Sequence, residues 1–569
     1  RLLSRGITMS FVHTSASGIV LSLCLVGCSG GSGDETPPVP PLGGQPSTPP
    51  PASPPPPPPA TQEAVSISGD VTFTQGGQSL RVPGYFAACG DAAETSCTSG
   101  NKWRVHFTPG QTGSWTYEIS FQEGANVALN GGGTPVANLD GVTGSFSIGG
   151  STKSGNDFRA PDRGRLSYQG EHYLQFSNGD PFFKVGADSP ENTLAYEDFD
   201  ATPNRGDRRK DWWPHLEDFS SAAGADAFVW QSTKGQELLG AWSYLAEQGV
   251  NTVSFLTFSL GGDDENIFPH LLRVSLTEYN GLGRNAQWDQ GVHHDRFDVS
   301  KLDQWERVFS YADQLGLFLH FKTMETENDQ LMDGGAFGPE RQLYYRELIA
   351  RFGHHLALNW NLGEEYTLST ETARQTLTYL EQIDPYGHLR VLHTYPGEWE
   401  QRYGPLLGSQ SALTGASVQT GNQNFNEVRD TLTEWVSRSR DQSKPWVVAL
   451  DEPGSASRGV SADTSYPTGQ LPQSRNQQDN REAVRSRVLW NTLTAGGAGV
   501  EYYYGYQTGC DDLMCEDHET RQSKWSDAAN AVAFFDAHIG QRALSMVESD
   551  ALLTTEGSSD EISSVGVYS

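Results

Sequence analysis

The feature that most constrains the fold is a regular alternation of short apolar runs with amphipathic stretches between residues 166 and 540. The apolar runs have the length of buried β-strands and cover Phe182–Gly186, Thr252–Leu256, Phe318–Lys322, Leu356–Leu362, Arg390–His393, Gly415–Gln419, Trp446–Leu450 and Gly499–Tyr503. The clearer amphipathic stretches are Gln236–Gln248, Lys301–Leu315, Glu340–Phe352, Thr372–Gln382, Asn426–Ser437, Arg481–Thr494 and Ser526–His538. Eight strands, each followed by a helical stretch, predict an α/β chain that folds as a (β/α)8 TIM barrel. The helix after the fifth strand is the least distinct.

A different pattern precedes the barrel, between residues 64 and 159. Apolar and polar residues alternate with period two in Val65–Gly69, Trp103–Phe107 and Trp115–Phe121, and glycines separate these runs. Such a pattern predicts a small all-β sandwich domain. The segment RVHFTPGQTGSWTY, Arg104–Tyr117, resembles the immunoglobulin-like domain of unknown function that precedes some glycoside hydrolases. Both a sugar-binding role and a packing role remain open for this domain.

The N-terminal 28 residues have the organisation of a secretory leader. The apolar run Gly18–Val26 is too short to span a bilayer and suits a signal-peptide core. It leads into Leu25-Val26-Gly27-Cys28, which resembles the bacterial lipobox. That resemblance implies that Cys28 is lipidated and anchors the protein to a membrane of the cell envelope. Ser29 after the cysteine resembles outer-membrane sorting, so we expect the outer membrane or the periplasm. The alternative is an ordinary cleavage site with a chance cysteine.

Residues 29–62 are rich in glycine, serine and then proline, with a proline run at residues 54–59. This composition favours an extended linker that cannot pack a core. At the other end, residues 541–569 read as the start of a C-terminal β segment that the chain truncates.

Composition excludes one class of partner and indicates an oxidising compartment. The formal net charge is −31, whereas nucleic-acid binding needs a basic surface. Of the six cysteines, Cys89 and Cys97 form one close pair and Cys510 and Cys515 form another. Short loops with paired cysteines predict disulfides in an exported protein. A metal site at the second pair, where His518 follows, is the alternative. We expect no cofactor and no catalytic metal.

Acidic and aromatic residues are enriched directly after the predicted strands. In a barrel of this type, the chemistry lies on the loops at the carboxyl ends of the strands. We therefore expect the following residues to meet at one rim: Asp188 and Glu191 after the first strand, Glu364 and Glu365 after the fourth, His393 and Tyr395 after the fifth, Gln419 after the sixth, Asp451 and Glu452 after the seventh, and Tyr504 after the eighth.

Two of these strand ends carry glutamates in a pattern that indicates glycoside hydrolysis. The fourth predicted strand runs into NWNLGEEY, Asn359–Tyr366, and the seventh into VVALDEPG, Val447–Gly454. Glutamates at the ends of strands four and seven resemble the signature of the clan A glycoside hydrolases. The resemblance implies that Glu365 is the general acid/base and Glu452 is the nucleophile of a retaining reaction. The clan usually has asparagine directly before the acid/base, and Glu364 stands there instead. We expect Glu364 to accept hydrogen bonds from sugar hydroxyls.

The barrel as a whole resembles glycosidases close to the apiosidase-like family. The segment NGDPFFKVGADSPENT, Asn178–Thr193, is similar to the opening segment of that family, which implies that Asp188 contacts the sugar. We expect His393, Tyr395, Gln419 and Tyr504 to complete the binding site for a poly- or oligosaccharide of plant or algal origin. The main alternative function is a catalytically inactive, surface-held glycan-binding lipoprotein. A lyase is a third hypothesis, but a lyase favours a tyrosine or basic residue as the base.

Overall fold

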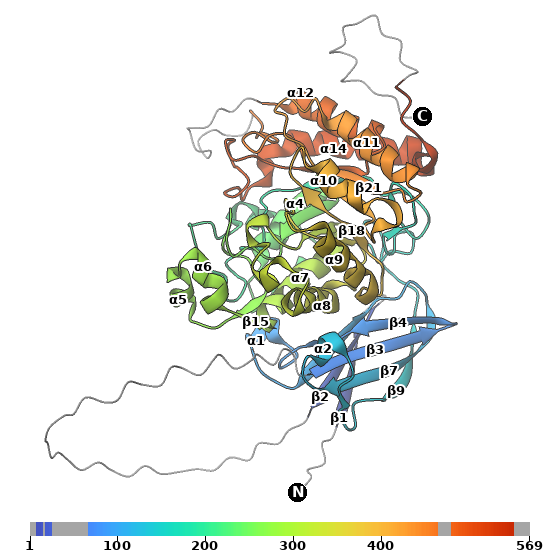
Figure 1. The fold of residues 1–569 in the computed structure, drawn as a ribbon, viewed down its shortest axis with the longest axis vertical. Coiled ribbons are helices and arrows are strands. Elements are labelled where there is room, and N and C mark those ends of the chain that lie inside the picture. Colours follow the sequence, from blue (N-terminus) through green and yellow to red (C-terminus); the bar gives the residue numbers. More distant parts are fainter. Residues whose placement is uncertain (1–6, 15–17, 26–66, 465–478, 551–569) are drawn as a thin grey trace, which may run out of the picture.

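The computed structural model describes residues 7–14, 18–25, 67–464 and 479–550 of the 569-residue chain. They form an antiparallel β domain and a larger parallel barrel covered by helices, and the β domain packs against one end of the barrel region (Figure 1). The predicted fold class, a TIM-like barrel preceded by a small β domain, is therefore confirmed. In the described part of the chain, no helix combines the length and the apolar character that crossing a lipid bilayer requires.

The β domain consists of two antiparallel sheets with a shared apolar core. One sheet has the order β4-β3-β7-β8, with β9 also paired to β7, and the other has the order β1-β2-β6-β5. Along β7, every second side chain from Trp115 to Phe121 is buried, which confirms the predicted alternation. Phe73 and Phe107 stack between the sheets with ring centroids 3.9 Å apart. The strand bounds are β1 (Ile7–Thr14), β2 (Gly18–Leu25), β3 (Ile67–Gln75), β4 (Gln78–Pro83), β5 (Tyr85–Phe86), β6 (Lys102–Phe107), β7 (Gly113–Glu123), β8 (Thr134–Pro135) and β9 (Thr143–Ile148).

Most of the predicted signal-peptide core lies in strand β2. This strand pairs antiparallel with β1 on one side and with β6 on the other, with Ile19 opposite Phe107. The signal peptide stays a prediction. Cys28 and the predicted linker at residues 29–62 lie outside the described residues. The lipid anchor therefore stays a prediction.

The barrel is a parallel sheet whose hydrogen-bonded order is β18-β17-β16-β13-β12-β22-β21-β20-β19. The strands at the two ends of this order, β18 and β19, are separated in the chain by Leu392 alone, so they are two halves of the fifth barrel strand. One half pairs with β17 and the other with β20, which closes a ring of eight strands. The bounds are β12 (Lys184–Ala187), β13 (Thr252–Leu256), β16 (Phe318–Lys322), β17 (Leu358–Asn361), β18 (Leu389–Val391), β19 (His393–Thr394), β20 (Gly415–Gln419), β21 (Val447–Glu452) and β22 (Gly499–Tyr502).

Helices cover the outside of the barrel (Figure 1). Helix α7 illustrates why they begin and end where they do: the Asp298 side chain accepts a hydrogen bond from the backbone N–H of Lys301, and Gly316 ends the helix in the left-handed conformation. The fifth helix, α10, has only five residues, which agrees with its indistinct sequence pattern. The helix bounds are α4 (Gln236–Glu247), α7 (Val299–Leu315), α8 (Pro339–Phe352), α9 (Thr370–Ile383), α10 (Trp399–Tyr403), α11 (Val428–Asp441), α12 (Arg481–Ala483), α13 (Asn491–Thr494) and α14 (Gln522–Phe534).

Shorter elements decorate the loops between these. They are α1 (Ala92–Thr95), α2 (Val127–Asn130), β10 (Ser167–Tyr168), β11 (Leu174–Gln175), α3 (Leu216–Ser221), β14 (His270–Leu272), α5 (Leu276–Gly281), α6 (Arg284–Ala286) and β15 (Val292–Phe297). In the predicted C-terminal β segment, a 3-10 turn covers Gly540–Ser545, and residues 551–569 lie outside the described residues.

The β domain is joined to the barrel by polar contacts as well as by packing. The backbone N–H of Ala93 donates to Asp303 of α7 at 3.0 Å, and Arg104 of β6 forms an ion pair with the same carboxylate at 3.1 Å. Arg346 of α8 forms an ion pair with Asp70 of β3. These contacts hold β6 against helix α7 and β3 against helix α8.

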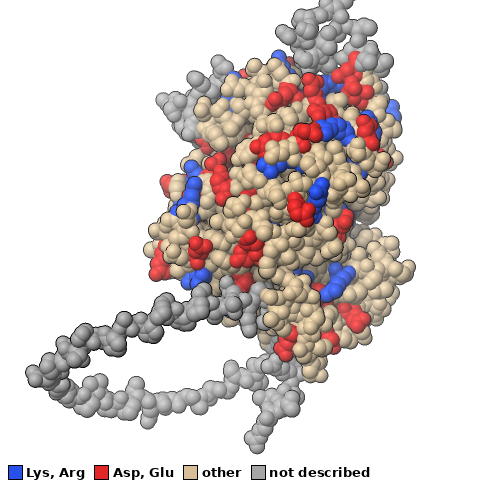
Figure 2. Space-filling model, in the orientation of Figure 1, with Lys and Arg blue, Asp and Glu red and all other residues tan. Residues whose placement is uncertain are grey.

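The acidity of the chain is distributed over its surface. Figure 2 shows acidic side chains spread across the visible face of the barrel, with basic side chains among them. Such a distribution favours solubility and forms no single basic patch on this face.

Candidate active site

The carboxyl ends of the barrel strands bring most of the predicted site residues together. Asp188 directly follows β12, Glu364 and Glu365 lie in the loop after β17, and Glu452 is the last residue of β21. Strand β21 is longer than predicted, so Glu452 is held within a strand. Ligand-type atoms of Asp188, Glu191 and Glu452 all lie within 4.8 Å of one another. The rim is therefore a concentrated group of carboxyls.

A buried lysine that the sequence analysis did not single out lies at the centre of this group. Lys322 ends β16 and is fully buried. Its Nζ atom lies 2.8 Å from Asp188 Oδ1 and 3.0 Å from Glu191 Oε1, and it also forms an ion pair with Glu364. Burial acts to lower the pKa of Lys322, but these three carboxylates outweigh it and hold the pKa well above its usual value. The ammonium is therefore a permanent counter-charge.

His393 connects the two strand ends that carry the glutamates. Its Nδ1 atom lies 2.9 Å from Glu364 Oε1, and its Nε2 atom lies 3.4 Å from Glu452 Oε2. Burial acts to raise the pKa of Glu364, but His393 and Lys322 outweigh it and hold the pKa below its usual value. Glu364 is therefore an ionised hydrogen-bond acceptor and a poor proton donor, which agrees with the role expected for it.

Glu365 lies in a different environment from its neighbour. Its backbone φ of 48° is in the left-handed region, which is unusual for a residue with a side chain. The Gln419 amide donates to Glu365 Oε1 at 2.8 Å, and the Tyr395 hydroxyl also hydrogen-bonds to the Glu365 side chain. Burial, together with the negative charge of Glu364, raises the pKa of Glu365. A carboxyl with a raised pKa suits a proton donor.

Glu452 is almost completely buried and is the second carboxyl of the candidate pair. Burial is the main reason that its pKa is raised well above the usual value, and the charges of Glu364 and Glu365 add to this effect, while Lys322 opposes it. Both glutamates therefore have raised pKa values, and a negative charge on Glu365 adds to the effect on Glu452.

A second residue that the sequence analysis missed, Asp512, borders this group of carboxyls. The backbone N–H of Glu191 donates to Asp512 Oδ1 at 3.3 Å, and the Ser189 hydroxyl also hydrogen-bonds to Asp512. Burial raises the pKa of Asp512 to about 7. The signal in the sequence was the acidic pair at residues 511–512 between two close cysteines.

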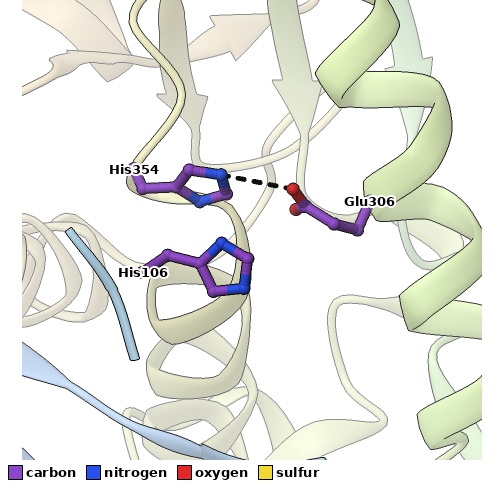
Figure 3. Close-up of side chains that lie close together, drawn as sticks. All are labelled: His106, Glu306 and His354. Atoms are coloured by element: carbon purple, nitrogen blue, oxygen red, sulfur yellow. Dashed lines mark ion pairs between the residues drawn. The ribbon is translucent and has the colours of Figure 1, made fainter. Parts of the chain in front are cut away.

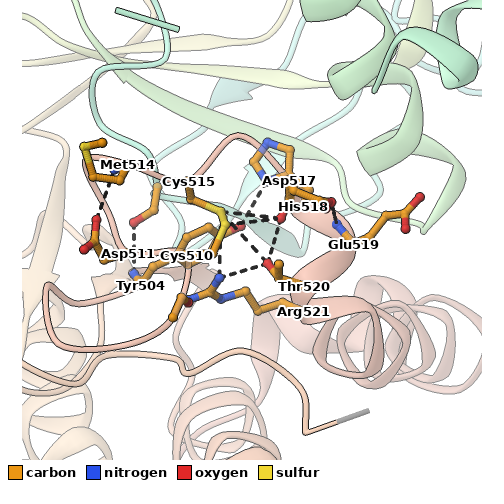
Figure 4. Close-up of a disulfide and its surroundings, with 12 residues drawn as sticks. Tyr504, Cys510, Asp511, Met514, Cys515, Asp517, His518, Glu519, Thr520 and Arg521 are labelled. Atoms are coloured by element: carbon orange, nitrogen blue, oxygen red, sulfur yellow. Dashed lines mark hydrogen bonds between the residues drawn. A yellow bond between two sulfur atoms is a disulfide. The ribbon is translucent and has the colours of Figure 1, made fainter. Parts of the chain in front are cut away.

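The loop that carries Asp512 is closed by one of two disulfides in the described structure. Cys510 and Cys515 are joined, as are Cys89 and Cys97 near the joint between the domains. Figure 4 shows Arg521 beside the Cys510–Cys515 bridge. The Arg521 guanidinium lies over the Tyr504 ring at 3.7 Å and donates to the carbonyl oxygen of Gly509 at 3.3 Å. These contacts fix the loop against the eighth strand.

Tyr504 is the predicted binding residue that the structure does not place beside the carboxyls of the rim. It is fully buried, and its hydroxyl is 2.9 Å from Nδ1 of His518 (Figure 4). Its neighbours Tyr503 and Tyr506 lie close enough to Glu452 and Glu191 for these acids to raise the tyrosine pKa values, although burial is the largest cause. Successive residues leave a strand end in different directions, so the aromatic candidates shift from Tyr504 to these two tyrosines.

A second charged layer lies inside the barrel beneath the rim. Glu501 Oε2 is 2.8 Å from His320 Nδ1, and Glu501 Oε1 is 2.9 Å from Lys184 Nζ. Lys184 also pairs with Asp451, and His320 Nε2 is 2.9 Å from the Asn361 amide. Burial acts to raise the pKa of Glu501, but His320 and Lys184 outweigh it and hold the pKa at about 2. This network ties together five strands below the rim.

The rim carboxyls and His393 are ligand types that a metal ion uses. However, the Lys322 ammonium already supplies the positive charge that a cation would bring to Asp188, Glu191 and Glu364. We therefore assign no metal to this part of the structure.

Comparisons with known proteins agree with the fold. Residues 62–122 match a family described as a domain of unknown function, DUF5060. No curated protein sequence matches the chain. A Bacteroides vulgatus protein described as a candidate glycoside hydrolase is similar in structure, with a TM-score of 0.53 and 15% identity over 84% of this chain and 76% of that chain. A glycoside hydrolase family 5 protein of the same organism has a TM-score of 0.41 and 15% identity over 70% and 76%. A β-glucuronidase from Ruminococcus gnavus has a TM-score of 0.35 and 9% identity over 92% and 67%. Of these, the first supports a shared barrel fold.

The central position of Lys322 leads to a stability prediction. Lys322→Met leaves three buried carboxylates without their counter-charge, so we expect the free energy of unfolding at pH 8 to fall by about 3–5 kcal/mol. In the variant, the carboxyls have folded-state pKa values above their unfolded values. Their contribution to stability is therefore present at low pH and is lost as the pH rises. Urea unfolding at pH 5 and pH 8 measures this difference.

The double variant Lys322→Met/Glu364→Gln is the matched control, because it removes one carboxylate together with the lysine. We expect it to recover part of the lost stability at pH 8. A loss that is the same at both pH values, with no recovery in the double variant, would contradict the role given to Lys322.

Proposed function

We propose that the protein is a retaining glycoside hydrolase in which Glu365 is the general acid/base and Glu452 is the nucleophile. The observation that carries this proposal is the pair of glutamates with raised pKa values at the ends of strands β17 and β21, at the rim where TIM barrels perform chemistry. The barrel fold shared with the Bacteroides vulgatus protein is consistent with the proposal. An inactive glycan-binding protein does not need two carboxyls with raised pKa values at these two strand ends.

The reaction that we propose is a double displacement in two steps. In the first step, Glu365 donates its proton to the glycosidic oxygen while the Glu452 carboxylate attacks the anomeric carbon, so the glycosidic bond breaks and a glycosyl ester forms. In the second step, Glu365, now ionised, takes a proton from water. The hydroxide equivalent then displaces Glu452 from the anomeric carbon. The raised pKa of Glu365 favours its protonated form at the start of the reaction. The leaving group takes that proton away, so Glu365 is ionised and can act as the base in the second step.

The remaining groups suit the binding of sugar hydroxyls. Glu364 stays ionised between Lys322 and His393 and accepts hydrogen bonds where clan A enzymes usually present an asparagine amide. Asp188 is fully buried beside Lys322. Gln419 and Tyr395 orient the acid through its carboxyl. Carboxylates that are paired with a basic side chain can still accept hydrogen bonds from the hydroxyl groups of a neutral sugar.

The charge of the rim also indicates the class of substrate. Lys322 and His393 are the basic side chains that contact Asp188, Glu364 and Glu452, and both are already paired with these carboxyls. An acidic sugar in this position would add a negative charge without a free cation to receive it. We therefore propose neutral or basic sugar units, in a poly- or oligosaccharide, as the residues cleaved.

The roles of the two adjacent glutamates can be separated by leaving-group dependence. Glu365→Ala should lose activity severely on a natural oligosaccharide but far less on a dinitrophenyl glycoside, because an activated leaving group departs without protonation. Azide should restore turnover of the activated substrate and give a glycosyl azide of retained configuration. Rates on both substrates, with product NMR, measure this.

Glu364→Ala is the matched control, and it should weaken both substrates alike because a hydroxyl contact does not depend on the leaving group. Leaving-group dependence in the Glu364 variant instead would mean that the two roles are exchanged. If neither variant shows it, the retaining mechanism is wrong.

Substrate charge provides an independent test. Matched pairs of aryl hexosides and hexuronides, with gluco and galacto configurations, are compared by kcat/KM at pH 7. We expect the hexuronide to be at least about 100-fold slower, since one unpaired charge at about 4 Å costs roughly 4 kcal/mol at an effective dielectric constant of ~20. Equal or faster turnover of the hexuronides would contradict the charge selection and leave the two-glutamate mechanism intact.

We further propose that the protein is anchored in the cell envelope through a lipid on Cys28. The support is the lipobox-like sequence at residues 25–28. Cys28→Ser should move the protein from the membrane fraction to the soluble fraction, as measured by immunoblot after ultracentrifugation. Ser29→Ala keeps the cysteine and serves as the control. Continued sedimentation of the Cys28 variant with membranes would refute the anchor.

A further inference from the structure

A second cluster of ligand-type side chains lies at the joint between the β domain and the barrel. His106 belongs to β6, Glu306 to α7, and His354 to the turn after α8 (Figure 3). One ligand-type atom of each residue lies within 4.8 Å of the other two. His354 Nε2 is 3.2 Å from Glu306 Oε1, and the two imidazole rings have centroids 4.2 Å apart. Three elements of two domains thus converge on one point.

The hydrogen bonds of His354 leave a lone pair directed at a carboxylate. Its Nδ1 atom is 2.9 Å from the carbonyl oxygen of Arg351, which can only accept, so Nδ1 carries the hydrogen. In the neutral ring, Nε2 then presents its lone pair to Glu306 Oε1. Two electron-rich atoms at this distance repel each other unless a cation lies between them. That cation is either a proton or a metal ion.

His106 presents a second neutral imidazole to the same point. Burial, helped by the nearby His354, holds the pKa of His106 well below its usual value. Its Nε2 atom is 2.6 Å from the Tyr85 hydroxyl, and its other ring nitrogen is directed toward His354 (Figure 3). A hydrogen bond from the far nitrogen to an oxygen is the usual outer partner of a metal-bound histidine. His354 has this arrangement, and His106 has it in the tautomer whose Nε2–H donates to the Tyr85 hydroxyl.

Glu306 is held in the ionised form that a ligand requires. Its Oε2 atom is 3.2 Å from Nε2 of His355, whose Nδ1 is in turn 2.8 Å from Asp313. Burial acts to lower the pKa of His355, but the two carboxylates outweigh it and raise the pKa to about 10. Burial likewise opposes ionisation of Glu306, but His354 and His355 hold its pKa well below the usual value. The imidazolium of His355 thereby orients the carboxylate, and Oε1 faces His354.

We propose that His106, His354 and Glu306 together bind one Zn²⁺-type ion that fastens the β domain to the barrel. Two imidazole nitrogens and one carboxylate oxygen are a ligand set that zinc favours, and hard cations such as Ca²⁺ prefer oxygen ligands alone. His354 and Glu306 are partly exposed, so solvent can complete a fourth position. His354 lies just before β17, at the amino end of the barrel and away from the catalytic rim. Residues at that end of a TIM barrel serve stability.

The test uses the full chain carrying Glu452→Gln, because Glu452 belongs to two of the ligand-type groups at the rim of the barrel. The protein is freed of metal with a chelator and titrated with Zn²⁺ by calorimetry, and thermal unfolding is followed with and without Zn²⁺. We expect one tight Zn²⁺ site per chain and a Tm raised by several degrees. Affinity should fall as the pH is lowered through the imidazole range, since protons compete for the nitrogens.

Four variants in the same background locate the site. His354→Gln and Glu306→Gln should each weaken Zn²⁺ binding at least tenfold and remove the rise in Tm. Tyr85→Phe, which removes the hydroxyl beside His106 and leaves the three ligands in place, should weaken binding by a smaller factor, about 10-fold or less. His538→Gln alters an exposed histidine that follows α14 and does not belong to the cluster. This variant should bind Zn²⁺ like the parent.

Each outcome has a definite meaning. Binding that is lost in His354→Gln and Glu306→Gln but kept in His538→Gln supports the site, and circular dichroism identifies any variant that fails to fold, in which case the other one decides. Absence of Zn²⁺ binding to the parent, or binding unchanged in both variants, overturns the proposal. A parent that binds no Zn²⁺ but gains stability as His354 protonates means that a proton bridges the cluster, and this too overturns it.

Discussion

The ion pairs between Lys322 and the carboxylates of Asp188, Glu191 and Glu364 are the interaction on which the rest of the catalytic rim depends. A group of carboxyls at one strand edge would otherwise repel one another and disfavour the closed barrel. The same solution recurs one layer below, where Lys184 and His320 neutralise Glu501 and Asp451. Charged residues fill positions that apolar side chains occupy in an ordinary barrel, so the interior depends on matched charges as well as on packing.

The two layers differ in their balance of charge, and that difference sets the direction in which the pKa values of their carboxyls shift. In the lower layer, a lysine and a histidine face two carboxylates, and Glu501 has a lowered pKa. In the upper layer, the carboxyls outnumber the cations, so Glu365 and Glu452 have raised pKa values while Glu364, in contact with both cations, has a lowered one. A surplus of negative charge beside the pair keeps one proton available, and general acid catalysis near neutral pH requires that proton.

The sequence predicts the barrel and the strand ends well because both depend on local pattern. Buried parallel strands read as short apolar runs, and the residues after them fall at one rim whatever the details of packing. The proposal for Glu365 and Glu452 comes from this pattern. Lys322 was missed because it is the last residue of a strand and its charge gives no sign of which carboxylates will surround it. Tyr504 was misplaced for a related reason: a shift of one residue at a strand end changes the direction of the side chain.

The cluster at the joint between the domains could not be predicted from the sequence, because its residues lie far apart in the chain. His106, Glu306 and His354 are separated by 200 and 48 residues in the chain, and only the docking of β6 on helices α7 and α8 brings them together. The balance of charge in this cluster differs from that at the rim. At the rim, the chain supplies its own cation in Lys322, and the surrounding acids are fixed around it. At the joint, the Glu306 carboxylate faces the imidazoles of His106 and His354 through Oε1. Its other oxygen, Oε2, pairs with His355. A cation at the centre of that cluster would bind the β domain and the barrel at the same time, and so would couple the stability of one domain to its contact with the other.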